Sequence, residues 1–194
     1  MRMPSRWFLV IPLALSGAAP PTLLAQHPQV REGFWIAFGP GYGSSHFSCT
    51  GCTGESKSGG SFDLRLGGTL RPDLLLGGDL SAWTHSENGV TETYGTAAFT
   101  GYFYPMVQSG LFVKGGVGAS TAHFETGGNT AYGTGLGFIF GAGYDIRVGR
   151  NISITPVVQF QYGTIGDIKL PSGPTVFPGL SQSLIAGALE VTFH

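Results

Sequence analysis

The sequence predicts an all-β fold, a membrane-spanning, antiparallel, up-and-down β-barrel of eight strands. Apolar and non-apolar residues alternate over long segments, as in "GFIFGAGYDIRVG" at 137–149, and successive side chains of a strand point to opposite faces. Charged residues make up only 11% of the 194 residues, while glycine occurs 33 times. Soluble domains carry about 25% charged residues, so this chain lacks the groups that keep a soluble surface hydrated.

The first 25 residues have the pattern of an export signal. Arg2 and Arg6 precede an apolar stretch from Trp7 to Leu15, and small residues follow it. A helix needs about 20 apolar residues to cross a bilayer, so this stretch is too short to span one. We expect residues 1–25 to be removed after Ala25 or Ala18, and residues 26–194 to form one barrel domain.

Alternation then recurs in eight segments, each long enough for the roughly 9–11 residues that a tilted strand needs to cross a membrane. In chain order, the strands are predicted near 33–46, 60–71, 74–85, 93–105, 110–124, 131–148, 151–163 and 181–193.

The connections are of two kinds. Short ones follow the second, fourth and sixth segments, at 71–73, 105–109 and 149–151. Longer ones, rich in Gly, Ser, Thr and Pro, follow the others, at 44–59, 86–93, 125–130 and 164–180. Short periplasmic turns with longer extracellular loops are typical of bacterial outer-membrane barrels. An even number of strands then places both termini on the periplasmic side.

Charge is confined to one face of the predicted strands. The apolar face carries no Asp, Glu, Lys or Arg, and the strand charges share the other face: Asp63, Arg65, Arg71, Asp79, Lys114, Asp145, Arg147 and Glu190. A basic side chain facing lipid at the bilayer midplane costs about 2–4 kcal/mol. The pattern therefore predicts an apolar face toward lipid and a charged face toward the lumen.

The remaining residues of the charged face are mostly Gly, Ala, Ser and Thr. A soluble barrel of the lipocalin type would need many Lys and Glu residues on that face, so we regard it as the weaker alternative. Glycine suits a crowded, narrow lumen because it leaves room for large side chains opposite. The predicted filling is Trp35, Trp83, Tyr102, Tyr104, Phe112 and Phe124.

With its export signal, eight strands and final strand "LIAGALEVTF" at 184–193, the chain resembles the OmpA/OmpX-like outer-membrane β-barrel family, a porin-like barrel domain. The resemblance implies the cell outer membrane of a Gram-negative-type bacterium, with outer-membrane lipid and lipopolysaccharide as surroundings. It also implies recognition of the C-terminal strand by the outer-membrane assembly machinery through an aromatic residue, which Phe193 matches, although His194 follows it.

Six lumen charges form the main candidate site: Asp63, Arg65, Asp79, Lys114, Asp145 and Glu190. Charges removed from water must be paired and hydrogen-bonded, because each otherwise costs several kcal/mol. We predict a salt-bridge network that plugs the lumen and fixes strand register. The alternative is a gate whose pairs exchange to admit ions.

Cys49 and Cys52 lie in the first long connection, and export to an oxidising compartment favours a disulfide between them. His46 gives the spacing H-x-x-C-x-x-C, so a zinc site that also uses His85 is an alternative. Redox chemistry of the thioredoxin type is less favoured because no βαβ pattern surrounds the motif. No cofactor is predicted.

Aromatic residues near the predicted strand ends indicate girdles at the two membrane interfaces. These are Tyr42, Tyr94, Tyr132, Tyr144, Tyr162 and Phe193. Pro40 and Pro156 lie within predicted strands, where each removes a ladder donor, so we expect a bulge or a strand end at each.

The predicted function is a structural or surface-interaction role through the connections at 44–59 and 164–180, with a loop partner that the sequence does not name and no nucleic acid. The alternative is a narrow channel or conduit for small ions or hydrophobic molecules. An enzyme that modifies lipid is a third class, for which the nearby same-face pairs would be His46 with Ser48 and His123 with Glu125. Neither pair completes a catalytic set, so no enzyme is predicted.

Overall fold

The computed structural model describes residues 30–51, 54–127, 129–169 and 175–194. The predicted signal at 1–25 and the residue Cys52 lie outside these ranges. Among the described residues, no helix has the length and the apolar character needed to cross a membrane.

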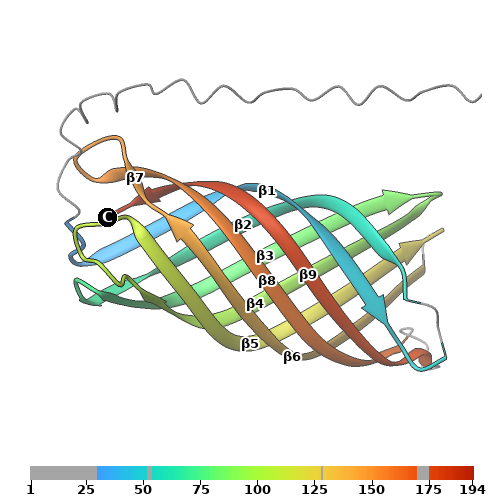
Figure 1. Ribbon diagram of the computed structural model, residues 1–194. Coiled ribbons are helices and arrows are strands. Elements are labelled where there is room, and N and C mark those ends of the chain that lie inside the picture. The colour runs from blue at the N-terminus through green and yellow to red at the C-terminus, as the bar shows by residue number, and fades with distance from the viewer. Residues whose placement is uncertain (1–29, 52–53, 128, 170–174) are drawn as a thin grey trace, which may run out of the picture.

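Antiparallel strands form one closed sheet (Figure 1). The order around the sheet is β6-β5-β4-β3-β2-β1-β9-β8-β7, and pairing of β6 with β8 closes the barrel. The short β7 continues the course of β6 beyond Asp145 along the same neighbour, β8, so the barrel has the eight strands predicted. The bounds are β1 Phe34–Ser48, β2 Ser56–Arg71, β3 Leu74–Glu87, β4 Val90–Phe103, β5 Leu111–Thr126, β6 Asn129–Tyr144, β7 Ile146–Arg147, β8 Ile152–Lys169 and β9 Thr175–Phe193.

Strands extend well into the segments expected to be long loops. Only Asn88 and Gly89 link β3 to β4, whereas residues 86–93 were predicted as a loop. Residues at both ends of 44–59 and 164–180 also pair as strands. These extensions are rich in serine and threonine, and threonine suits a strand as well as a loop. The marked difference in length between connections at the two ends is therefore not observed.

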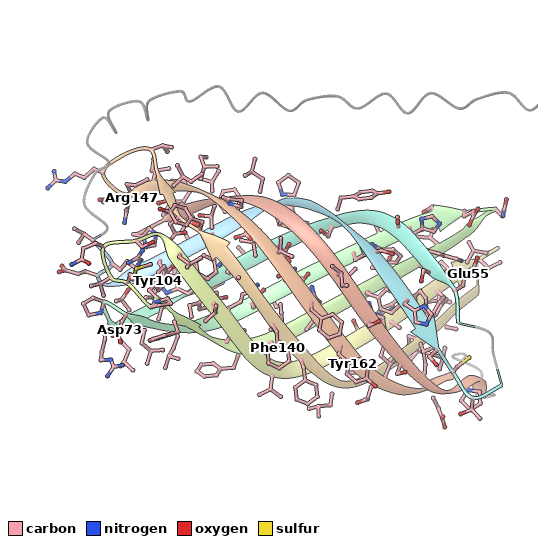
Figure 2. The ribbon with its side chains drawn as sticks, viewed as in Figure 1. Glu55, Asp73, Tyr104, Phe140, Arg147 and Tyr162 are labelled. Atoms are coloured by element: carbon pink, nitrogen blue, oxygen red, sulfur yellow. The ribbon has the colours of Figure 1, made fainter. Side chains whose placement is uncertain are left out.

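Burial follows the predicted alternation. Outward side chains are exposed and apolar, with Phe34, Phe99 and Val158 each exposing at least 63% of their surface. Inward side chains are buried, including Trp35, Trp83, Tyr102, Tyr104 and Phe112. Figure 2 shows Phe140 and Tyr162 pointing away from the barrel wall. The apolar surface that a soluble protein would bury thus covers the outside of this barrel.

Inward glycines occupy places where the barrel wall has no room for a side chain. A Cβ on Gly67 would lie 2.1 Å from the Leu76 carbonyl oxygen, and one on Gly77 would lie 2.3 Å from the Leu66 carbonyl oxygen. The next residues, Gly68 and Gly78, face outward, and a Cβ there would meet nothing within 4 Å. Crowding of the concave face explains why glycine dominates the uncharged positions of that face.

Pro40 and Pro156 both lie inside strands, beside the same residue of β9. Pro156 pairs with Leu189. On the other side of β9, the ladder with β1 is interrupted between the pairs Phe38–Val191 and Gly41–Ala188, which leaves out Pro40. The registers show no shift there, so the expected bulge or strand end is absent and only hydrogen bonds are lost.

Candidate functional site in the barrel lumen

A lysine from β5 forms the centre of the lumen. The ammonium of Lys114 donates to Asp79 Oδ2 on β3 at 2.6 Å and to Gln159 Oε1 on β8 at 2.7 Å. The hydroxyl of Tyr102 on β4 donates to the same Asp79 oxygen at 3.2 Å. Lys114 and Asp79 have no exposed side-chain surface, so this pair is fully removed from water.

A second ion pair lies beside the first. Arg65 on β2 donates from Nε to Glu190 Oε2 on β9 at 2.6 Å, and its Nη2 contacts the same oxygen. The guanidinium also lies over the rings of Tyr102 and Phe112, at 5.5 and 5.4 Å from the ring centroids. Aromatic faces favour a cation at this range, so the rings and the carboxylate together hold Arg65 in place.

Asp63 on β2 has neutral neighbours. Its Oδ1 accepts a hydrogen bond from Gln159 Nε2 at 2.7 Å, and Ser81 is its other hydrogen-bonding neighbour. Gln159 thereby connects Asp63 to Lys114, since its amide oxygen accepts from the ammonium. We call the space around Asp63, Arg65, Asp79, Lys114 and Glu190 the polar chamber.

Asp145 belongs to a different cluster at the end of the barrel that holds the termini. Its Oδ2 accepts from the Tyr104 hydroxyl at 2.9 Å, and its Oδ1 accepts from Thr155 at 2.9 Å. Arg31 Nε and His194 Nε2 lie 3.9 and 3.7 Å from Oδ2. The sequence predicted one network for six charges; the contacts of the described residues place Asp145 at the mouth, just beyond the end of β6 at Tyr144, with Tyr104 and Thr155 as hydrogen-bond partners.

Two arginines fasten the segment before β1 across this mouth. Arg31, which is 2% exposed, donates to the carbonyls of Val107 and Ser109 at 3.0 and 2.7 Å. Its guanidinium lies 3.7 Å from the centroid of the Tyr104 ring. Arg147 donates to the Val30 carbonyl at 2.9 Å. Figure 2 places Arg147 and Tyr104 at the end opposite Glu55.

Burial at this mouth also affects His194. Removal from water lowers the pKa of His194 to about 4, although Asp145 acts in the opposite direction. The imidazole is therefore neutral at neutral pH, and Arg31 and Arg147 supply the positive charge around Asp145.

An aromatic layer separates the mouth from the polar chamber. Trp35, Tyr102, Phe112 and Tyr104 contact one another in sequence, with ring centroids 4.9, 5.9 and 5.4 Å apart. Leu75 and Val157 complete this buried cluster. Tyr102 bonds to Asp79 on the chamber side, and Tyr104 bonds to Asp145 on the mouth side.

A larger apolar layer fills the other end of the lumen. Phe47 packs on Tyr94 and Phe124 at 4.6 and 5.8 Å between ring centroids, and Trp83 donates to the Gly43 carbonyl at 3.1 Å. The remaining buried members are Ala122, Ala131, Ile165, Ile168, Leu180, Leu184 and Ala186. The lumen is thus layered, with apolar material on both sides of the polar chamber.

Comparison with known proteins identifies the fold. No family model and no curated protein matches the chain. Among solved structures, Neisserial surface protein A is 16% identical, with a TM-score of 0.56 over 84% of this chain and 98% of that one. Ail, the attachment invasion locus protein of Yersinia pestis, is 15% identical, with a TM-score of 0.55 over 82% of this chain and 99% of that one. The chain has the fold of the eight-stranded outer-membrane β-barrels.

Of the six aromatic residues predicted to form girdles at the membrane interfaces, five face outward and one does not. Tyr42, Tyr132, Tyr144, Tyr162 and Phe193 all point outward, with exposures from 37% to 64%. Tyr94 was placed in the girdle wrongly: it faces inward, is 2% exposed and belongs to the apolar layer.

Among the described residues of the rim, the histidines of the candidate sites contact other partners than those predicted. His46 Nδ1 bonds to Ser56 rather than Ser48, at 3.0 Å, and His123 stacks on Tyr132 at 6.3 Å. Among the described residues, no three His, Cys, Asp or Glu side chains form a group that could hold a metal ion. Cys52 lies outside those residues, so its disulfide with Cys49 stays a prediction.

Several residues of the lumen were missed by sequence reasoning. Gln159, Gln161 and Ser81 line the polar chamber, where Gln161 donates to Ser81 at 2.7 Å. These residues occupy lumen-facing positions in the alternation of their strands, which was a usable signal, but uncharged polar residues were not considered as candidates. Arg31 carried no such signal, because it precedes the first strand and its partners are backbone carbonyls far away in the chain.

Proposed function

We propose that this chain is an outer-membrane barrel whose lumen is closed to solutes and which acts through its outer surface. The observation that supports the proposal is the series of buried side chains along the described lumen, in the mouth cluster, the aromatic layer, the polar chamber and the apolar layer. Eight-stranded barrels are just wide enough for side chains to fill their interior. A closed lumen leaves the exterior as the functional surface.

The outward apolar face supports a membrane location. Hydrocarbon is the solvent in which exposed Phe, Leu and Val side chains cost nothing, whereas exposed charge there is expensive. Every strand charge in the described central lumen is buried instead, including Asp63, Arg65, Asp79 and Lys114. We propose outer-membrane lipid and lipopolysaccharide as the surroundings of this face, and β9 with Phe193 as the strand that the assembly machinery recognises.

The strands are longer than a membrane crossing requires, which supports one end of the barrel projecting from the membrane. Apart from β7, the strands run from 14 residues in β3 and β4 to 19 in β9, more than the roughly 9–11 that cross a bilayer. Toward the end opposite the termini, the outward face changes from apolar to polar. This polar collar consists of the exposed residues Ser44, His46, Ser56, Ser58, Thr84, Ser86 and Thr164.

The collar and the hairpin tips above it form the proposed interaction surface. Side chains pair across strands here, with Ser86 and Thr91 hydroxyls 3.0 Å apart. The two similar structures are those of a surface protein and of an attachment invasion locus protein. We propose a surface role of this general kind, with hydroxyl groups as the main recognition elements and without a catalytic step.

Epitope insertion tests the orientation. An epitope placed between Asn88 and Gly89 should bind antibody on intact cells, because this turn lies at the collar end. The same epitope between Pro72 and Asp73 should bind antibody only after the cells are permeabilised. Labelling of the second insertion on intact cells, or of neither after permeabilisation, would contradict the proposed placement.

Conductance tests the closed lumen. The purified barrel reconstituted in planar bilayers should give no steady conductance above that of a protein-free bilayer. A steady, large conductance from the folded protein would rule out the plug and favour the narrow channel.

A further inference from the structure

The polar chamber contains an odd number of charged side chains. Arg65 is paired with Glu190, and Lys114 is paired with Asp79. Asp63 is the fifth, and both cations are already bound to other carboxylates. With all five groups ionised, the chamber would carry one uncompensated negative charge.

Asp63 is poorly placed to carry that charge. It has no exposed surface, and its hydrogen-bonding neighbours Gln159 and Ser81 are both neutral. Its second oxygen, Oδ2, is buried and accepts no hydrogen bond. An isolated carboxylate buried in this way costs several kcal/mol unless it becomes neutral or acquires a cation.

Two more carboxylate oxygens of the chamber lack a hydrogen-bond partner, Asp79 Oδ1 and Glu190 Oε1. Glu190 Oε1 is buried without a partner, since Arg65 occupies only Oε2. Asp63 pairs with Gly39 on β1, and a Cβ on Gly39 would lie 2.6 Å from the Glu190 Cα. The two acidic residues therefore flank a residue that has no side chain, and both face the lumen.

We propose that the polar chamber binds one proton, carried by the Asp63 carboxyl and directed at the free oxygen of Glu190. Asp63 and Glu190 then form a carboxylic acid–carboxylate pair across Gly39, and the chamber becomes electrically neutral. The added O–H lies on Asp63 Oδ2 and donates to Glu190 Oε1, which leaves Asp79 Oδ1 as the one carboxylate oxygen of the described chamber without a donor.

The other groups that face the chamber leave this proton on Asp63. The charged or titratable ones are Asp79 from β3, Tyr102 from β4, Lys114 from β5 and Arg65 from β2. Asp79 Oδ2 already accepts from the Lys114 ammonium and the Tyr102 hydroxyl, so Asp79 has the paired cation that Asp63 lacks. The inward residues that β1, β6 and β8 place nearby are Gly39, Gly141 and Gln159, none of which titrates.

Infrared spectroscopy of the full barrel in lipid vesicles tests the proposal directly. At neutral pH the wild type should show the carbonyl stretch of a buried carboxylic acid, and Asp63→Asn should lack it. Asp145→Asn, at the mouth, is the matched control and should retain it. Absence of the band from the wild type, or its persistence in Asp63→Asn, would overturn the proposal.

Unfolding in urea supplies a second measurement. Asp63→Asn replaces a neutral acid by a neutral amide, so its unfolding constant should change by less than about fivefold. Asp79→Asn leaves Lys114 buried without its counterion, and should raise the unfolding constant by more than about a hundredfold. Equal, large effects of the two substitutions would overturn the proposal.

A sodium ion could neutralise Asp63 in place of a proton, and salt substitution separates the two. Exchanging sodium for choline at constant ionic strength should leave the stability of the wild type unchanged. Stabilisation by sodium that Asp63→Asn abolishes would overturn the proton and assign a metal cation. If Asp63→Asn does not fold, the wild-type spectrum still decides, because solvent-exposed carboxyls are ionised at neutral pH.

Discussion

Glycine shows how strongly the inside and outside of this wall differ for a single residue. Gly67 and Gly68 are neighbours in β2, yet a Cβ on the first would meet backbone at 2.1 Å and one on the second would meet nothing within 4 Å. Gly67 pairs with Gly77, so two strands approach closely where neither has a side chain. Residue choice on the concave face is therefore set by space rather than by solvent.

This contrast gives a matched pair of substitutions. Gly67→Ala should destabilise the barrel by about 1–3 kcal/mol, since backbone must shift to accept the methyl group. Gly68→Ala should change the free energy of unfolding by less than about 0.5 kcal/mol, as is usual away from packed sites. Reversible urea unfolding in lipid vesicles, followed by tryptophan fluorescence, measures both. Equal effects of the two substitutions would show that strand propensity, and not crowding, governs these positions.

At the scale of elements, the alternation of residues located every long strand but did not show at which residue each strand ends. The predicted strand at 74–85 continues to Glu87 and that at 93–105 begins at Val90. Hydroxyl-rich stretches fit both strand and loop, so their pairing is decided by the neighbouring strand, which a single sequence does not reveal. The dipeptide Asn88-Gly89 was the available signal, because it favours a two-residue hairpin turn.

The candidate site was predictable to a similar degree. Parity placed Arg65, Asp79, Lys114 and Glu190 in the lumen, since it follows from strand geometry alone. Their pairing was not predictable, because it depends on how side chains reach past an intervening strand, from β2 past β1 to β9 and from β5 past β4 to β3. The partners of Asp145 at the mouth were not predictable for the related reason that the sequence did not locate the end of β6 at Tyr144.

The Asn88-Gly89 turn can be tested as an element. Both residues have positive φ, 50° and 77°, a conformation that costs an L-residue other than glycine roughly 1–2 kcal/mol. Gly89→Ala should therefore destabilise the barrel by about 1 kcal/mol, whereas Asn88→Gly should change stability by only a few tenths. Urea unfolding midpoints at unchanged slope would report these differences. Loss of stability in Asn88→Gly comparable to that in Gly89→Ala would argue against a conformational cause.

The whole molecule is arranged for two solvents at once. Its outer face carries apolar side chains along the part of the barrel nearer the termini, and hydroxyl groups toward the collar. Its inner face buries ion pairs that join strands on either side of a third strand, β2 and β9 around β1, and β3 and β5 around β4. Because lipid accepts the outer face without cost, stability depends on the bilayer as well as on contacts within the chain.

A charge scan along the outer face measures where the lipid begins and ends. Val158 lies in the middle of the apolar outward stretch of β8 and is 63% exposed, so Val158→Arg should destabilise the barrel by about 2–4 kcal/mol in vesicles. Ser58, in the collar, faces water by this account, and Ser58→Arg should cost less than about 0.5 kcal/mol. Urea unfolding from vesicles compares the two variants with the wild type. Similar costs at the two positions would mean that one solvent surrounds the whole barrel, which is incompatible with a protein that crosses a membrane at one end and projects from it at the other.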